Sequence, residues 1–126
     1  QNNKEIFTHF SQIQLNIQQN KRIEAMEKLK TLFESIDEIY IADMCRYQYA
    51  WLTFLQGNVD STKEILDAIT NYTIYKERAH IFNAEILDYL NQDINGAIDT
   101  YLKFLELYPN SIHYDNIRLR LREITS

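Results

Sequence analysis

The chain has 126 residues and a mass of 15.1 kDa, which is the size of about one domain. Two glycines and one proline are too few for a fold of many short strands, and too few for the glycine-rich loops that hold nucleotide phosphates. A formal net charge of −5 argues against nucleic-acid binding, and no segment has the roughly eighteen uncharged apolar residues of a membrane span. The lone Cys45 allows neither an intrachain disulfide nor a zinc site built from thiolates.

Apolar residues recur at steps of three and four in the first half of the chain, which is the spacing of helices with one buried face. The opening segment is poorly periodic and contains Phe7, Phe10, Leu15 and Ile17. After a polar break at 19–21, the next helix has an apolar face formed by Ile23, Met26, Leu29, Leu32 and Phe33. A third helix, which we expect to end at Gly57, has the apolar face Met44, Tyr47, Trp51, Phe54 and Leu55.

The second half of the chain predicts four more helices and no strand, for a total of seven helices. Asn58 or Asp60 caps the fourth helix, which ends near 71–72. The fifth helix has a predicted core face of Ala79, Phe82, Ile86, Tyr89 and Leu90, opposite a polar face of His80, Asn83, Glu85, Asp88 and Asn91. Asp93 caps the sixth helix, which ends before Pro109, and Asn110 or Ser111 caps the last.

The even-numbered helices share an internal repeat. Small residues at 25, 62 and 97 are 37 and 35 residues apart, close to the period of about 34 residues in helix-turn-helix repeats. In this register three more columns align, namely Leu29 with Leu66 and Tyr101, Leu32 with Ile69 and Phe104, and Asn20 with Gly57 and Gln92 at the turn. Because one helix pair cannot bury its apolar face alone, such a repeat predicts pairs that stack on one another.

These residues resemble the tetratricopeptide repeat family, in which a small residue near the helix crossing is followed four positions later by an aromatic residue, and a proline closes the second helix. Ala97, Tyr101 and Pro109 match this pattern in full. The second repeat has Thr62 in place of the alanine, and the most degenerate first repeat keeps Ala25.

The resemblance implies an all-α fold in which one domain, 1–126, forms a right-handed superhelical stack. About three helix pairs are expected, at 5–36, 38–72 and 74–109, followed by a C-terminal capping helix at 111–125. The segments 101–111 and 118–122 resemble a subgroup common in bacterial cell-envelope proteins, including outer-membrane assembly lipoproteins. This implies the bacterial periplasm or the outer-membrane periphery, with the cytoplasm as the alternative.

Repeats of this family bind a peptide, a helix or a partner domain, and carry no chemistry. The resemblance therefore implies a non-enzymatic scaffold without cofactor or metal, which binds a protein or peptide and no nucleic acid. The candidate partner-binding residues are Tyr47, Trp51, Phe54, Phe82, Arg118 and Arg122. Large aromatic residues at helical spacing also suit a core, and for Tyr47, Trp51 and Phe54 the spacing favours core over groove.

Residues that could carry chemistry are few. Glu77 and His80 have the Glu-x-x-His spacing of di-iron bundle proteins, but a second motif is missing because neither His9 nor His113 has a glutamate three positions earlier. Glu85 and Asp88 could form an acid–base pair only in a pocket that shifts their pKa values, so we expect a solvated helix face. Cys45 is expected to be a small buried residue rather than a nucleophile.

Two further roles stay open. Arg118, Arg120 and Arg122 form a basic cluster that could receive an acidic partner segment or acidic lipid headgroups. The alternative is that they pair with Asp115, with Glu123 or with acidic residues of the preceding repeat. As other functions, the last helix could mediate homo-oligomerisation by completing a neighbouring stack, and a helical-bundle metal enzyme is the less favoured alternative.

Overall fold

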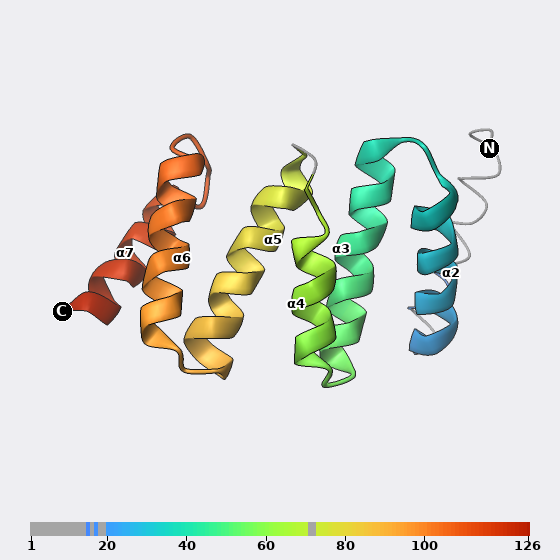
Figure 1. The fold of residues 1–126 in the computed structure, drawn as a ribbon, viewed down its shortest axis with the longest axis horizontal. Coiled ribbons are helices and arrows are strands. Elements are labelled where there is room, and N and C mark those ends of the chain that lie inside the picture. Colours follow the sequence, from blue (N-terminus) through green and yellow to red (C-terminus); the bar gives the residue numbers. More distant parts are fainter. Residues whose placement is uncertain (1–14, 16, 18–19, 71–72) are drawn as a thin grey trace. The chain divides into compact units, whose positions relative to one another are not determined.

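The computed structural model describes residues 15, 17, 20–70 and 73–126, and all regular structure within them is helical. In chain order (Figure 1) the elements are α2 (Arg22–Ser35), α3 (Ile39–Leu55), α4 (Val59–Asp67), α5 (Ile74–Glu85), the π-helical turn η1 (Ile86–Leu90), α6 (Ile94–Leu107) and α7 (Tyr114–Thr125). The prediction of an all-α fold without strands is thus confirmed for the described residues. Phe7 and Phe10 lie outside them, and the fourth helix ends at Asp67, before the predicted end near 71–72.

The chain groups into two compact units, with the boundary between Lys76 and Glu77 in the first turn of α5. The first unit contains α2, α3 and α4, and the second contains the rest of α5 together with η1, α6 and α7. In the first unit α3 packs against both α2 and α4, and in the second α6 packs against η1 and α7. Each unit therefore has a central helix with a neighbour on two sides.

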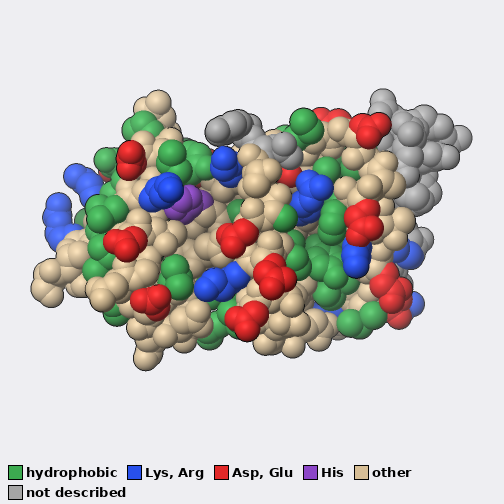
Figure 2. Space-filling view, viewed as in Figure 1, with side chains coloured by type: hydrophobic (Ala, Val, Ile, Leu, Met, Phe, Trp, Pro, Cys, Tyr) green, Lys and Arg blue, Asp and Glu red, His purple; other side chains and the backbone are tan. Residues whose placement is uncertain are grey.

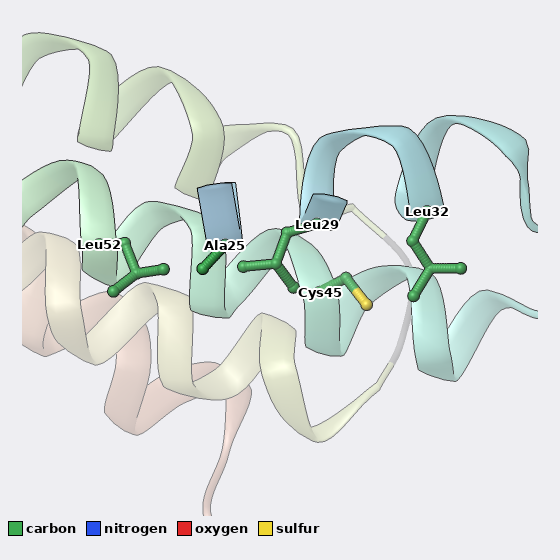
Figure 3. Close-up of a cluster of buried hydrophobic side chains, with 5 residues drawn as sticks. All are labelled: Ala25, Leu29, Leu32, Cys45 and Leu52. Carbon is green, nitrogen blue, oxygen red and sulfur yellow. The ribbon is translucent and has the colours of Figure 1, made fainter. Parts of the chain in front are cut away.

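The core of the first unit lies between α2 and α3. Figure 3 shows Leu29 of α2 beside Cys45 of α3, with Ala25 and Leu32 on the same face of α2. Leu52 of α3 completes the cluster, and all five side chains are at most 3% exposed. The predicted apolar face of the second helix is therefore right at Leu29 and Leu32, whereas Ile23 at its start is exposed.

The predicted buried face of α3 is wrong. The buried residues of α3 are Ala42, Asp43, Cys45, Ala50, Leu52 and Thr53. Trp51 is 47% exposed and Leu55 is 40% exposed, while Met44, Tyr47 and Phe54 are partly buried. Because α3 has a helix on two sides, small residues such as Ala42, Cys45 and Ala50 occupy the contacts, where they let the helix axes approach.

The three repeat columns that lie outside the turn consist of buried residues. Ala25, Thr62 and Ala97 have no exposed surface, and the other six aligned residues of α2, α4 and α6 and the turn after α4 are at most 3% exposed. The turn column is equally regular, because the described residues with positive φ are Asn20 (58°), Gly57 (83°) and Gln92 (52°). The turn between α3 and α4 and the turn between η1 and α6 thus each contain one residue in the left-handed region, which lets the next helix run antiparallel to the element before it.

Helix ends follow the predicted signals in part. Asn58 Oδ1 accepts a hydrogen bond from Ser61 N (3.3 Å), and Asp93 Oδ1 accepts one from Gly96 N (3.0 Å), so both predicted caps form. Helix α6 ends at Leu107, two residues before Pro109, as expected. Helix α7 begins at Tyr114, whereas a start near 111 was predicted, and Ser111 Oγ accepts from His113 N in the turn before it.

The π-helical turn changes which side of the fifth helix is buried. In η1 the backbone bond from Asn91 N to Ile86 O (2.9 Å) spans five residues, so the turn is wider than that of an α-helix. Asp88, predicted to be solvated, is buried, whereas Tyr89 (59% exposed) and Leu90, predicted to be core, are at the surface. Ala79, Phe82 and Ile86 are buried as predicted, since they precede or begin the wider turn.

The left-handed turns give a paired stability test. Gly57→Ala is expected to lower the free energy of unfolding by about 1 kcal/mol, because a Cβ disfavours this backbone conformation although nothing lies within 4 Å of its position. Gln92→Gly is expected to raise it by about 0.5 kcal/mol, because the steric penalty disappears. Urea denaturation of both variants and wild type measures the difference, and two changes of the same sign would contradict the prediction.

Candidate functional site

The six predicted partner-binding residues divide between the two units. Tyr47, Trp51 and Phe54 lie on α3, whereas Phe82 lies on α5 and Arg118 and Arg122 lie on α7. Phe82 is only 8% exposed and so offers little surface to a ligand. The two arginines are exposed.

A hollow of about 290 Å³ lies beside the C-terminal part of α3. Its lining residues are Ile17, Asn20, Arg22, Gln48, Trp51, Leu52 and Leu55. The Trp51 ring stacks on Phe54 with a centroid separation of 5.9 Å and an interplanar angle of 21°. Of the predicted aromatic residues on α3, Trp51 therefore lines the hollow, and Phe54 contacts the Trp51 ring without lining it.

Tyr47 belongs to a different group, a tyrosine cluster formed by Tyr40, Tyr47 and Tyr75. The ring of Tyr75 packs against Tyr40 (5.3 Å) and Tyr47 (5.9 Å). Beside it the buried Asp43 accepts hydrogen bonds from Thr73 Oγ1 (2.9 Å) and Arg46 Nη1 (3.2 Å). These contacts tie the start of α5 to α3, so Tyr47 has a packing role within the first unit.

The second unit contains a polar cluster that sequence reasoning missed, formed by Asp88, Tyr101 and Arg120. The Asp88 side chain is fully buried, and its Oδ2 accepts hydrogen bonds from Tyr101 Oη (2.7 Å) and Arg120 Nε (2.8 Å). Its Oδ1 accepts from Arg120 Nη2 (2.9 Å), so the pairing with the guanidinium is bidentate. The Arg120 guanidinium also lies 4.7 Å from the centroid of the Tyr89 ring. The cluster thereby joins η1, α6 and α7.

The pKa values of this cluster follow from its geometry. The hydrogen bonds from Arg120 lower the pKa of Asp88, against the opposing effect of burial, and the Tyr101 hydroxyl lowers it further. Burial and the hydrogen bond to Asp88 raise the pKa of Tyr101. Desolvation, and then the Asp88 charge, raise the pKa of Glu85. Asp88 is thus held ionised with both oxygens occupied, which suits a structural ion pair better than proton transfer.

Two arginines of the predicted basic cluster, Arg118 and Arg120, pair with carboxylates, and the third, Arg122, is exposed. Arg118 lies 3.6 Å from Asp115, and Arg120 lies 3.4 Å from Glu123 as well as against Asp88. The predicted alternative of pairing with Asp115, Glu123 and an acid of the preceding repeat is therefore correct for these two arginines. The signal that could have identified Arg120 is its position, three residues after the buried Ile117 and one before the partly buried Leu121 of the same helix.

The other chemistry-bearing residues have packing partners. His80, expected to be solvated, is partly buried; its Nε2 donates to Thr100 O (3.0 Å) and its ring packs edge-on against Phe104. Cys45 is fully buried, and burial raises the pKa of its thiol to about 11, so it is almost entirely protonated at neutral pH. Within the described residues no three His, Cys, Asp or Glu side chains are grouped to hold a metal ion.

The surface carries charges of both signs. Figure 2 shows acidic and basic side chains interspersed over the described part of the face that it draws, without a continuous basic stripe. No described helix combines the length and apolar character needed to cross a bilayer. The apolar surface is more distinctive, because Trp51 and Leu55 are both exposed at the rim of one hollow.

Removing the buried carboxylate tests the cluster. Asp88→Asn is expected to lower the free energy of unfolding by about 2 kcal/mol, because Arg120 loses its bidentate partner within the fold. Tyr101→Phe, which leaves that ion pair intact, is expected to cost about 1.5 kcal/mol. Chemical denaturation measures both variants against Asp99→Asn, an exposed aspartate of α6 that should behave as wild type. Equal stabilities of Asp88→Asn and Asp99→Asn would contradict the structural role.

The same carboxylate predicts a pH dependence. A lowered pKa in the folded state stabilises the fold above the unfolded value of about 3.9, and this contribution is lost as the pH falls through the folded value. Wild type and Asp99→Asn should therefore lose more stability than Asp88→Asn between about pH 5 and pH 2. Denaturation at a series of pH values measures this, and parallel acid profiles for all three proteins would refute it.

Comparison with known proteins completes the description. No family model, no curated protein and no solved structure matches the chain. The fold class of the chain therefore rests on its own helices. Its function is inferred from the hollow beside α3 and from the side-chain packing within each unit.

Proposed function

We propose that this chain is a non-enzymatic protein-interaction module whose helix pairs form a tetratricopeptide-like superhelical stack. The buried columns at Ala25, Thr62 and Ala97 support the repeat, and so do the left-handed residues at the three hairpin turns. The module binds a segment of a partner protein at the hollow beside α3, which is lined by Trp51 and Leu55 among others. The resemblance of 101–111 to cell-envelope repeat proteins supports the bacterial periplasm or outer-membrane periphery as its location.

One observation carries this proposal, namely the exposure of two large apolar side chains one helical turn apart. Trp51 and Leu55 stand at positions i and i+4 of α3, so both project from the same side of the helix. Leu52, at the inner side of the same hollow, is buried in the core and so holds the site on a rigid element. A preformed surface of this kind loses little conformational entropy when a ligand binds.

The buried polar groups support a binding role over a catalytic one. The carboxylates of Asp43 and Asp88 are occupied by arginine, threonine or tyrosine donors, and the Cys45 thiol is buried. The side chains that line the hollow are apolar, amide or guanidinium groups. None of these described lining groups acts as a general base at neutral pH, whereas apolar, amide and guanidinium groups all make favourable contacts with peptides.

Self-association through the last helix has less support. Ile117 is buried in the second unit's own core, and Leu121 and Ile124 pack against the same cluster. Completing a neighbouring stack through these residues would require α7 to leave α6 and the Asp88 carboxylate.

Capture of partner proteins tests the proposal with matched variants. Trp51→Ser and Leu55→Ser are each expected to reduce binding of a captured and then purified partner by tenfold or more, because both lose apolar contact at the hollow. Leu102→Ser removes a leucine that is 50% exposed on α6 and should leave binding unchanged. Isothermal calorimetry gives the affinities, and thermal melting within about 2 °C of wild type shows that the fold is intact. Equal affinities for all four proteins would place the binding surface elsewhere and refute this function for the hollow.

A further inference from the structure

Among the described residues that line the hollow beside α3, one side chain is charged. Apolar groups come from Ile17, Trp51, Leu52 and Leu55, amides come from Asn20 and Gln48, and the guanidinium comes from Arg22. Its volume of about 290 Å³ is at the lower end of the range for small-ligand pockets, which begins near 300 Å³. The hollow is therefore sized for one or two side chains rather than for a whole helix.

Arg22 differs in its charged neighbours from two arginines of the second unit, Arg118 and Arg120. Arg118 and Arg120 each lie within 4.0 Å of a carboxylate, whereas none of the ion pairs among the described residues involves Arg22. Arg22 is partly buried at the first position of α2, and Lys21 precedes it as the N-cap. The Lys21 side chain makes no capping hydrogen bond, and Glu24 of the same turn does not line the hollow. Arg22 thus places one positive charge in the lining of an apolar recess, in a chain whose net charge is −5.

We infer that the hollow binds an acidic-apolar peptide segment, in which a bulky aliphatic side chain is followed directly by a carboxylate. This inference rests on the proposed function and specifies the chemistry of the partner. The aliphatic side chain lies against Trp51 and Leu55, where it removes apolar surface of both molecules from water. The carboxylate lies against the guanidinium of Arg22, which presents paired donors for it. A basic segment of the same length would bring a second cation to Arg22.

Trp51 provides a direct readout, since it is the only tryptophan of the chain. The probes are two blocked heptapeptides that differ in charge alone, one with two leucines followed by two glutamates and one with lysines in place of the glutamates. The acidic peptide is expected to change the tryptophan emission saturably and to bind at least tenfold more tightly than the basic peptide. Its affinity should fall as salt is raised, because part of it is electrostatic. Equal binding of the two peptides, or binding of neither, would overturn the inference.

A charge reversal separates this role from a structural one. Arg22→Glu is expected to reverse the preference, so that the basic peptide binds more tightly than the acidic one. The matched control is Lys103→Glu, a reversal of an exposed basic residue on α6, which should keep the wild-type preference. An unchanged preference in Arg22→Glu would overturn the inference, whereas a lost fold would show as a changed melting temperature and not as a reversed preference. If neither peptide binds while partner capture still depends on Trp51 and Leu55, the partner chemistry inferred here fails and the proposed function stands.

Discussion

The close approach of neighbouring helices is the constraint on which the rest of this structure depends. Ala25, Thr62 and Ala97 are completely buried, and each is a small residue on the second helix of a predicted pair. A larger side chain at such a position would separate the helices and open voids beside Leu29, Leu66 or Tyr101. The left-handed residues Gly57 and Gln92 serve the same end, because they let α4 and α6 run back antiparallel to the element before them within a few residues.

Because α3 packs against a helix on two sides, only some of its apolar side chains can be buried. Ala42, Cys45 and Ala50 take the contact positions, so bulky residues are displaced to the margins of the helix. Tyr47 contacts Tyr75 and Trp51 stacks on Phe54, while the side chains of Trp51 and Leu55 stay partly at the surface, 47% and 40% exposed. The candidate binding site is thus a consequence of how the core is built, and it lies on a helix that the core holds in place.

In the second unit, closely packed elements are joined by a buried charged group, the Asp88 carboxylate. The wider turn of η1 brings Asp88 to a position without solvent, where an unpaired carboxylate would be strongly destabilising. Arg120 reaches it from α7, and Tyr101 from α6, so the polar cluster is satisfied only when these elements are assembled together. A buried ion pair adds little net stability over apolar packing, but its loss is costly, and it therefore favours one arrangement of the last helix.

The local sequence determined the features that depend on neighbouring residues. Helix type, the caps at Asn58 and Asp93 and the helix end before Pro109 follow from spacings of a few residues, and the structure agrees with them. The small buried residues at 25, 62 and 97 follow from similarity between segments 37 and 35 residues apart in the chain. The tertiary structure decided which side of a helix is buried when two sides carry apolar residues, as on α3, because this depends on how many neighbours the helix has. The tertiary structure also decided that Asp88 is buried and paired. A π-helical turn leaves no periodic signal in the sequence, and Arg120, the partner of Asp88, is 32 residues away in the chain. The hollow beside Trp51 belongs to the same class, because its walls come from segments that meet only when α2 packs on α3.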